Sequence, residues 1–318
     1  MCFPEMQDPK ERPFKFAKSK WIVFFSARVH PGETPSSFVL NGILDFLISG
    51  WKQAKKLLSN FVFKIVPLVN PDGVSRGYYR LDTFGQNLNR FYLDPTTAKQ
   101  PTIFGIHACL KQLSSYDQLD YYIDLHAHPI KRGCFLFGNM LPEENYVDNL
   151  MFGKLISMNT LNFDYAECNF SRINPWKEDE KDRLKRDGSG RVGIYHLTKV
   201  PHCYTLECNY ASGWKGKRLP PKVILETGKM EPDPPINDFK KILLNENGKP
   251  VYNTEVFEDV GRAVVISLLD MIGENPISRL PKSIYKDIEQ MRLDIQIQNN
   301  VNVLEARRLK QELIKSRA

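Results

Sequence analysis

Apolar runs of strand length alternate along this chain with segments whose apolar residues recur at helical spacing. Continuous apolar runs predict strands that are buried on both faces; they lie at residues 21–27, 61–69 and 119–125. Shorter runs predict further strands at residues 133–138 and 203–207. Helical spacing predicts helices at residues 34–50, 103–113, 145–158 and 256–271. This alternation predicts an α/β fold with a mixed, mostly parallel sheet flanked by helices.

Local signals refine the first of these connections. Thr34 is a candidate N-cap with Pro35 at the first helical position, a combination that favours a helix start. The second strand runs into Asn70-Pro71-Asp72-Gly73, which is a strong turn signal.

The same patterns divide the chain into three parts. Residues 1–20 are polar, proline-bearing and basic, and we interpret them as a linker or a truncated edge. Residues 21–275 carry the alternating pattern and form the main domain, with a polar loop at 171–191 and an irregular stretch at 212–255. Residues 276–318 are rich in Lys, Arg and Glu with sparse apolar positions, and we predict a charged helical C-terminal tail.

Composition and charge narrow the setting without fixing a function. The chain has 318 residues, a net charge of +7 and 42% hydrophobic residues, so it can bury a core and favours acidic partners. No apolar stretch approaches the length of a membrane span, and the first residues lack the apolar core of a secretory signal. The six cysteines show no CxxC pairing. We expect reduced thiols and a cytosolic or nuclear protein.

A candidate metal site follows the first predicted strand. His30 and Glu33 come directly after it, at the sheet edge where α/β folds build sites. Catalytic zinc takes three nitrogen or oxygen ligands from the protein and keeps one position for water. His126 ends the third predicted strand at the same edge and is the preferred third ligand, with His128 as the alternative. The remaining three histidines show no partner pattern, so we expect structural roles for His107, His196 and His202.

Longer motifs around these residues resemble the zinc metallocarboxypeptidases, and most closely their cytosolic carboxypeptidase branch. The matching stretches are SARVHPGETPSS (26–37), NPDGV (70–74), YRLDTFGQNLNR (79–90), DLHAH (124–128) and YTLECNY (204–210). The likeness extends over about residues 20–272, and residues 131–135 and 188–192 are most similar to members that remove glutamate from tubulin. The resemblance also implies a β-sandwich domain ahead of the catalytic domain, which this sequence does not contain.

The resemblance assigns roles to individual positions. It implies one Zn²⁺ held by His30, Glu33 and His126, with Glu207 as the general base that activates water. Arg80 matches the arginine that polarises the scissile carbonyl. Asn89 and Arg90 match the pair that binds the terminal carboxylate of the substrate. Asn87 stands where digestive relatives have an aspartate beside the first zinc histidine, so His30 gains a hydrogen bond there but no charge.

The substrate implied is the glutamylated tail of tubulin and other acidic polyglutamylated proteins, with no role for nucleic acid or membrane. Arg191 is the candidate reader of a terminal glutamate side chain, and Lys131, Arg132 and Lys199 are its rivals. The corresponding location is the cytoplasm, with the cytoskeleton and nucleus as further sites. Two other functions fit the same motifs: an amidohydrolase of small N-acyl amino acids, and an inactive, truncated microtubule-binding relative.

Overall fold

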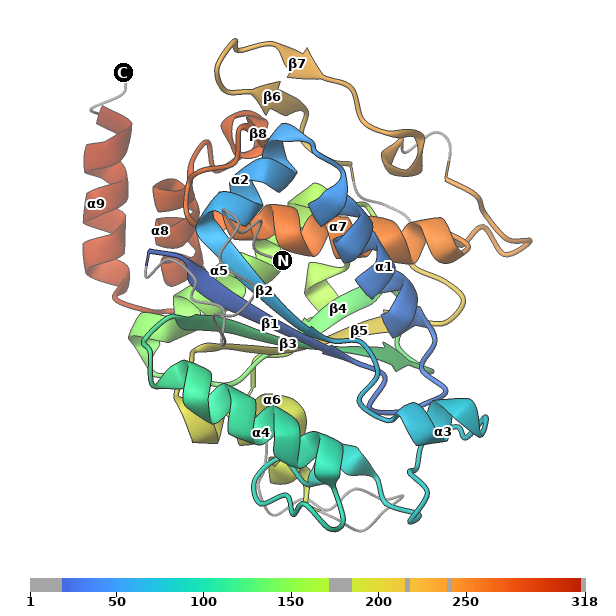
Figure 1. Cartoon of the computed structure of the whole chain (residues 1–318). Coiled ribbons are helices and arrows are strands. Elements are labelled where there is room, and N and C mark those ends of the chain that lie inside the picture. The colour runs from blue at the N-terminus through green and yellow to red at the C-terminus, as the bar shows by residue number, and fades with distance from the viewer. Residues whose placement is uncertain (1–18, 172–184, 215–217, 239–241, 316–318) are drawn as a thin grey trace, which may run out of the picture.

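A central sheet organises the domain. The computed structural model describes residues 19–171, 185–214, 218–238 and 242–315. Within them, five strands pair in the order β2-β1-β3-β5-β4 (Figure 1). Their bounds are β2 Phe61–Val66, β1 Trp21–Ala27, β3 Leu119–His128, β5 His202–Asn209 and β4 Cys134–Phe137. Strands β2, β1, β3 and β5 run parallel and β4 is antiparallel to β5, which confirms the predicted mixed, mostly parallel sheet.

Helices cover both faces of this sheet (Figure 1). One face carries α1 (Pro35–Ile48), α2 (Lys52–Asn60), α5 (Glu143–Asn159) and α7 (Thr254–Met271). The other face carries α4 (Pro101–Ser114) and α6 (Gly190–Thr198). Side chains alternate between the two cores along a strand: Val23 and Phe25 of β1 join the core under α1 and α7, whereas Ile22 and Phe24 join the core under α4. Burial on both faces explains the continuous apolar runs in the sequence.

The remaining elements are short or lie outside the central sheet. A small sheet has the order β7-β6-β8, and short helical turns connect the larger elements. These elements are β6 Lys222–Ile224, β7 Met230–Glu231, β8 Ile277–Ser278, α3 Pro71–Ser75, η1 Leu88–Arg90, η2 Tyr165–Glu167, η3 Arg186–Gly188, η4 Pro235–Asn237 and η5 Leu280–Lys282. Among the described residues, no helix is both long and apolar enough to cross a bilayer.

Several boundaries differ from the predictions. Strand β2 ends at Val66 instead of 69, and β3 continues to His128. Helices α2 and α6 form where no helix was predicted. Thr34 occupies the N-cap position of α1, but its backbone is already helical and its side chain makes no capping hydrogen bond, so capping by this hydroxyl was a wrong expectation.

The C-terminal segment is helical and packs against the domain. It contains α8 (Ile288–Gln298) and α9 (Val303–Lys315). Leu280, Tyr285, Met291 and Ile295 are buried and belong to the larger core. Arg292 of α8 also forms an ion pair with Asp148 of α5, at 2.6 Å between Nη2 and Oδ1. Of the predicted linker and polar loop, residues 1–18 and 172–184 lie outside the described residues.

Candidate metal centre and active site

The turn between β1 and α1 places the first two candidate ligands. Beyond Ala27 the backbone turns through Arg28, which has a positive φ of 61°. The Arg28 guanidinium donates to the carbonyl oxygen of Pro31 and holds the turn closed. A side chain at Gly32 would stand only 2.7 Å from the Tyr79 ring, so the turn requires glycine there. Both His30 and Glu33 are buried as a result.

Three candidate ligands converge at the end of the sheet. Nδ1 of His30 lies 2.7 Å from Oε1 of Glu33, and Nδ1 of His126 lies 2.9 Å from Oε2 of the same carboxylate. All three ligand atoms lie within 4.8 Å of one another, close enough to serve a single cation. Two imidazole nitrogens and a carboxylate match the ligand preference of zinc.

Each imidazole has an outer partner that orients it. Nε2 of His30 lies 3.0 Å from Oδ1 of Asn87, which also accepts a hydrogen bond from the backbone N–H of Asn89. Nε2 of His126 lies 2.7 Å from Oδ2 of Asp124. Because both partners are acceptors, each imidazole keeps its proton on Nε2 and turns Nδ1 toward the cluster. Asp124 was missed in the sequence, although its spacing of two from His126 on one strand would have placed both on the same face.

The charges of the cluster also fit a cation. Burial alone would raise the pKa of Glu33, but His30 and His126 outweigh it and hold the pKa well below its ordinary value. Burial alone would lower the pKa of His126, but Asp124 and Glu33 outweigh it and raise the pKa well above its ordinary value. The cluster therefore attracts positive charge, which a divalent metal would supply in place of the imidazolium proton.

His128, the alternative third ligand, has a different environment. Its Nδ1 accepts backbone N–H groups from Ile130 and Lys131 and so stabilises the turn after β3. Its ring packs edge-on against Phe135. The structure thus brings His126 to the cluster, and His128 to the following turn.

Glu207 lies beside the candidate ligands. In the register of β3 and β5 it is the direct partner of His126. Its side chain is buried, and Oε2 has no hydrogen-bond partner among the described residues. Burial raises the pKa of Glu207 to about 7; Glu33 and Asp124 act in the same direction, and His126 and Arg80 oppose it. A buried carboxylate with a pKa near neutrality can both accept and return a proton.

Residues 80–90 form another wall of the site. Arg80 is partly exposed, with Nη1 at 3.8 Å from Oε1 of Glu33. Asn89 is buried in η1, and its Oδ1 accepts a hydrogen bond of 2.8 Å from the backbone N–H of Gly190. Arg90 donates from Nη1 to the carbonyl oxygen of Asn89. The segment thereby links the candidate metal centre to the start of α6.

Arg191 is the buried cation among the four specificity candidates. Nη1 donates to the carbonyl oxygen of Gly138 and to Oδ1 of Asn139, at 2.5 and 2.6 Å. Burial lowers the pKa of Arg191 to about 10, while Cys203 and Glu207 act in the opposite direction. It therefore stays charged at neutral pH within the electrostatic reach of Glu207.

The three rival cations lie in other settings. Lys131 pairs with Glu167 at 3.2 Å, Arg132 stacks on Trp214, and Lys199 caps the far end of α6.

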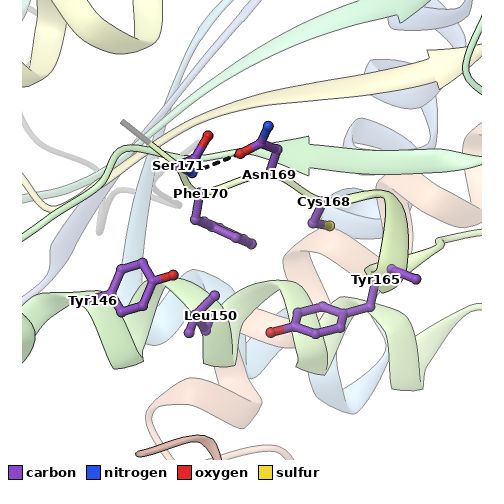
Figure 2. A pocket seen from close by; sticks show the side chains of 8 residues that line it. Tyr146, Leu150, Tyr165, Cys168, Asn169, Phe170 and Ser171 are labelled. Carbon is purple, nitrogen blue, oxygen red and sulfur yellow. Dashed lines mark hydrogen bonds between the residues drawn. The ribbon is translucent and has the colours of Figure 1, made fainter. Parts of the chain in front are cut away.

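A separate cavity lies between α5 and residues 165–171 (Figure 2). It has a volume of about 390 Å³, and Tyr146, Leu150, Tyr165 and Phe170 supply most of its apolar lining. Its lining residues are distinct from all the candidate site residues.

Comparison with known proteins supports this description. A family model described as zinc carboxypeptidase matches residues 9–101. Human cytosolic carboxypeptidase-like protein 5 is 34% identical over 377 residues, which cover 91% of this chain and 41% of that protein. Human cytosolic carboxypeptidase 6 is 33% identical over 280 residues, which cover 85% of this chain and 48% of that protein. The chain thus spans less than half the length of either relative.

Solved structures support the fold. A metallo-carboxypeptidase from Burkholderia cenocepacia superposes with a TM-score of 0.59 at 21% identity, covering 80% of this chain and 57% of that chain. At this level of identity, the likeness concerns the fold alone. Together with the sequence relatives and the family model, it leads to one conclusion. The chain belongs to the zinc carboxypeptidase family, in its cytosolic carboxypeptidase branch.

Proposed function

We propose that this chain is the catalytic part of a zinc-dependent carboxypeptidase that removes glutamate from polyglutamylated proteins, tubulin tails foremost. The observation that carries the proposal is the convergence of His30, Glu33 and His126 beside the buried Glu207. The proposed setting is the cytoplasm and its cytoskeleton, with the nucleus as a further site.

The residues of the site divide the work of peptide hydrolysis. His30, Glu33 and His126 hold the zinc, which when bound polarises the scissile carbonyl and makes water a stronger acid. Glu207 accepts a proton from the attacking water and returns it to the leaving amine. Arg80, beside Glu33 and partly exposed, stabilises the negative charge that develops on the carbonyl oxygen.

Two further interactions set the substrate. Asn89 and Arg90 bind the terminal carboxylate and so restrict cleavage to chain ends. Arg191 pairs with the side chain of the terminal glutamate, because a buried cation gains strongly from an anionic partner. The net charge of +7 further favours acidic tails. Both polyglutamate side chains and their branch-point glutamate are substrates in this proposal.

Release of free glutamate from glutamylated tubulin tests the function. We expect release by the zinc-loaded protein and a loss of at least about 10³-fold in the Glu207→Gln variant, since the proton carrier is removed. Zinc content measured in both proteins verifies that the metal is unaffected. Absence of release by a folded, zinc-loaded protein that still sediments with microtubules would favour a binding-only function.

The same assay tests the substrate preference. Peptides ending in glutamate or leucine are compared, and Arg191→Ala is expected to lower kcat/KM for glutamate by about 10²-fold while leaving leucine nearly unchanged. Arg132→Ala is the matched control, because this cation stacks on Trp214 outside the proposed pocket. An unchanged preference in Arg191→Ala would remove this residue from the proposal.

A further inference from the structure

A chain of buried hydroxyl groups leads from the candidate ligand His126 into the sheet. Oδ2 of Asp124 lies 2.7 Å from Nε2 of His126, and Oδ1 of Asp124 lies 2.7 Å from Oγ of Ser26. Oγ of Ser26 lies 3.1 Å from the hydroxyl of Tyr122. Ser26, Tyr122 and Asp124 are each at most 1% exposed, so water does not substitute for any of these contacts.

The register of the sheet produces this chain of contacts. Ser26 of β1 is the direct partner of Asp124 on β3. Tyr122, Asp124 and His126 alternate along β3 and therefore share one face of the sheet. The side chains are thus fixed by strand pairing and not by a flexible loop.

The donors and acceptors fix the direction of the hydrogen bonds. The Asp124 carboxylate can only accept, so Ser26 must donate its one proton to it. The Tyr122 hydroxyl must then donate to Ser26, because Ser26 has no second proton to give. Asp124 consequently accepts from both Ser26 and His126, and its second oxygen is held in position for the imidazole.

Gly190 joins the same chain to the proposed substrate-binding residues. A side-chain carbon at Gly190 would lie 2.8 Å from the Tyr122 hydroxyl and 3.1 Å from Oδ2 of Asp124. The backbone N–H of Gly190 donates to Asn89, the proposed carboxylate-binding residue. The first residue of α6 therefore contacts both groups at close range.

We propose that Ser26 and Tyr122 are positioning residues, which act through Asp124 to hold His126 in the orientation that binds the metal. The proposal rests on the zinc site of the proposed function. Loss of either hydroxyl leaves Asp124 with one fewer fixed partner, so His126 loses orientation without any change in the ligands themselves.

Zinc affinity measured by competition with a chromogenic chelator tests this role without any assay of activity. Direct partners of a metal-bound histidine usually change affinity by about 10–100-fold, and Asp124→Asn is expected in that range. Ser26→Ala and Tyr122→Phe act one contact further out, and each is expected to weaken zinc binding by roughly 3–10-fold. Because they act through one chain, the double variant is expected to bind zinc about as weakly as the weaker single variant.

Matched controls remove buried hydroxyls elsewhere. Tyr204→Phe loses a hydroxyl that donates to Asn149, and Ser267→Ala loses one that donates to the carbonyl oxygen of Ala263. Both controls are expected to keep the zinc affinity of the unmodified chain. The visible spectrum of the cobalt-substituted protein provides a second readout, and we expect it to change in Ser26→Ala and Tyr122→Phe but not in the controls.

The outcomes separate this proposal from the proposed function. Tight zinc binding by the unmodified chain, with affinity within about twofold in Tyr122→Phe and Ser26→Ala, overturns the positioning role alone. Equal losses in the two controls overturn it as well, since they show a general effect of core damage. Failure of the unmodified, folded chain to bind zinc overturns the proposed function, and this inference with it. Tyr122→Phe alone decides if Ser26→Ala does not fold.

Discussion

Glu207 combines two properties that oppose each other in the folded chain: it is buried, and its Oε2 has no hydrogen-bond partner among the described residues. A carboxylate in such a position destabilises the folded state once it is ionised. The same burial raises its pKa from 4.5 to about 7 and prepares it to carry a proton. Function and stability therefore make opposite demands on this one side chain.

The metal-free protein is expected to show this conflict in its pH dependence. Between about pH 4.5 and 7 the unfolded chain loses a proton that folded Glu207 retains, so stability falls as pH rises through this window and then levels off. Glu207→Gln removes this loss, and at pH 8 the variant is expected to be roughly 3 kcal/mol more stable than the parent. Urea unfolding of both proteins at several pH values from 4 to 8 measures the difference. Parallel stability curves would contradict the assigned pKa.

Sequence reasoning reached the candidate ligands because they follow the ends of predicted parallel strands. His30 follows β1 and His126 lies near the end of β3, so their approach needed only the alternation of strands and helices. The outer contacts were less accessible. The pairing of Ser26 with Asp124 depends on the register of two strands far apart in the sequence, and the contact of Arg191 with Gly138 depends on how a loop folds back.

At the scale of elements, long buried strands were predictable and glycine-rich helices were not. Helix α6 begins in Gly188-Ser189-Gly190, a composition typical of a loop. Its glycines are there for close packing: a side-chain carbon at Gly193 would lie 2.7 Å from the Cβ of Tyr92. Tertiary contacts thus outweigh local helix propensity, which a single sequence does not reveal.

The crossing of α1 and α7 depends on glycine in the same way. A side-chain carbon at Gly261 of α7 would lie 2.0 Å from the carbonyl oxygen of Val39 in α1, so the helices would have to separate. Gly261→Ala is expected to destabilise the protein by about 3 kcal/mol, at the upper end of overpacking costs. It is also expected to weaken zinc binding, because Glu33 precedes α1 and moves with it.

Gly105→Ala on α4 is the matched control for this prediction. Nothing lies within 4 Å of a side-chain carbon at that position. Alanine there is expected to stabilise the helix by up to about 1 kcal/mol through propensity alone. Chemical unfolding of both variants gives the comparison, and a similar effect at the two sites would show that α1 and α7 do not constrain each other.

At the scale of the whole molecule, the C-terminal segment was predicted as a charged helical tail because charged residues dominate its composition. Its few apolar residues are the informative ones. Met291 and Ile295 lie one helical turn apart on α8 and are both buried in the core shared with α5 and α7. A narrow apolar face within a charged helix marks a packed helix, and composition alone conceals it.

Single substitutions on the two C-terminal helices distinguish a packed segment from a tail. Met291 is fully buried, so Met291→Ala is expected to destabilise the protein by about 2–5 kcal/mol through loss of apolar contact and the cavity it leaves. Leu304 on α9 is 86% exposed, and Leu304→Ala is expected to change stability by less than about 0.5 kcal/mol. Urea unfolding, followed by a probe in the sheet, measures both. If the two variants match the parent, the segment folds independently of the sheet and residues 276–318 are a tail; if only Met291→Ala shifts the single transition, they are part of the domain that holds the site.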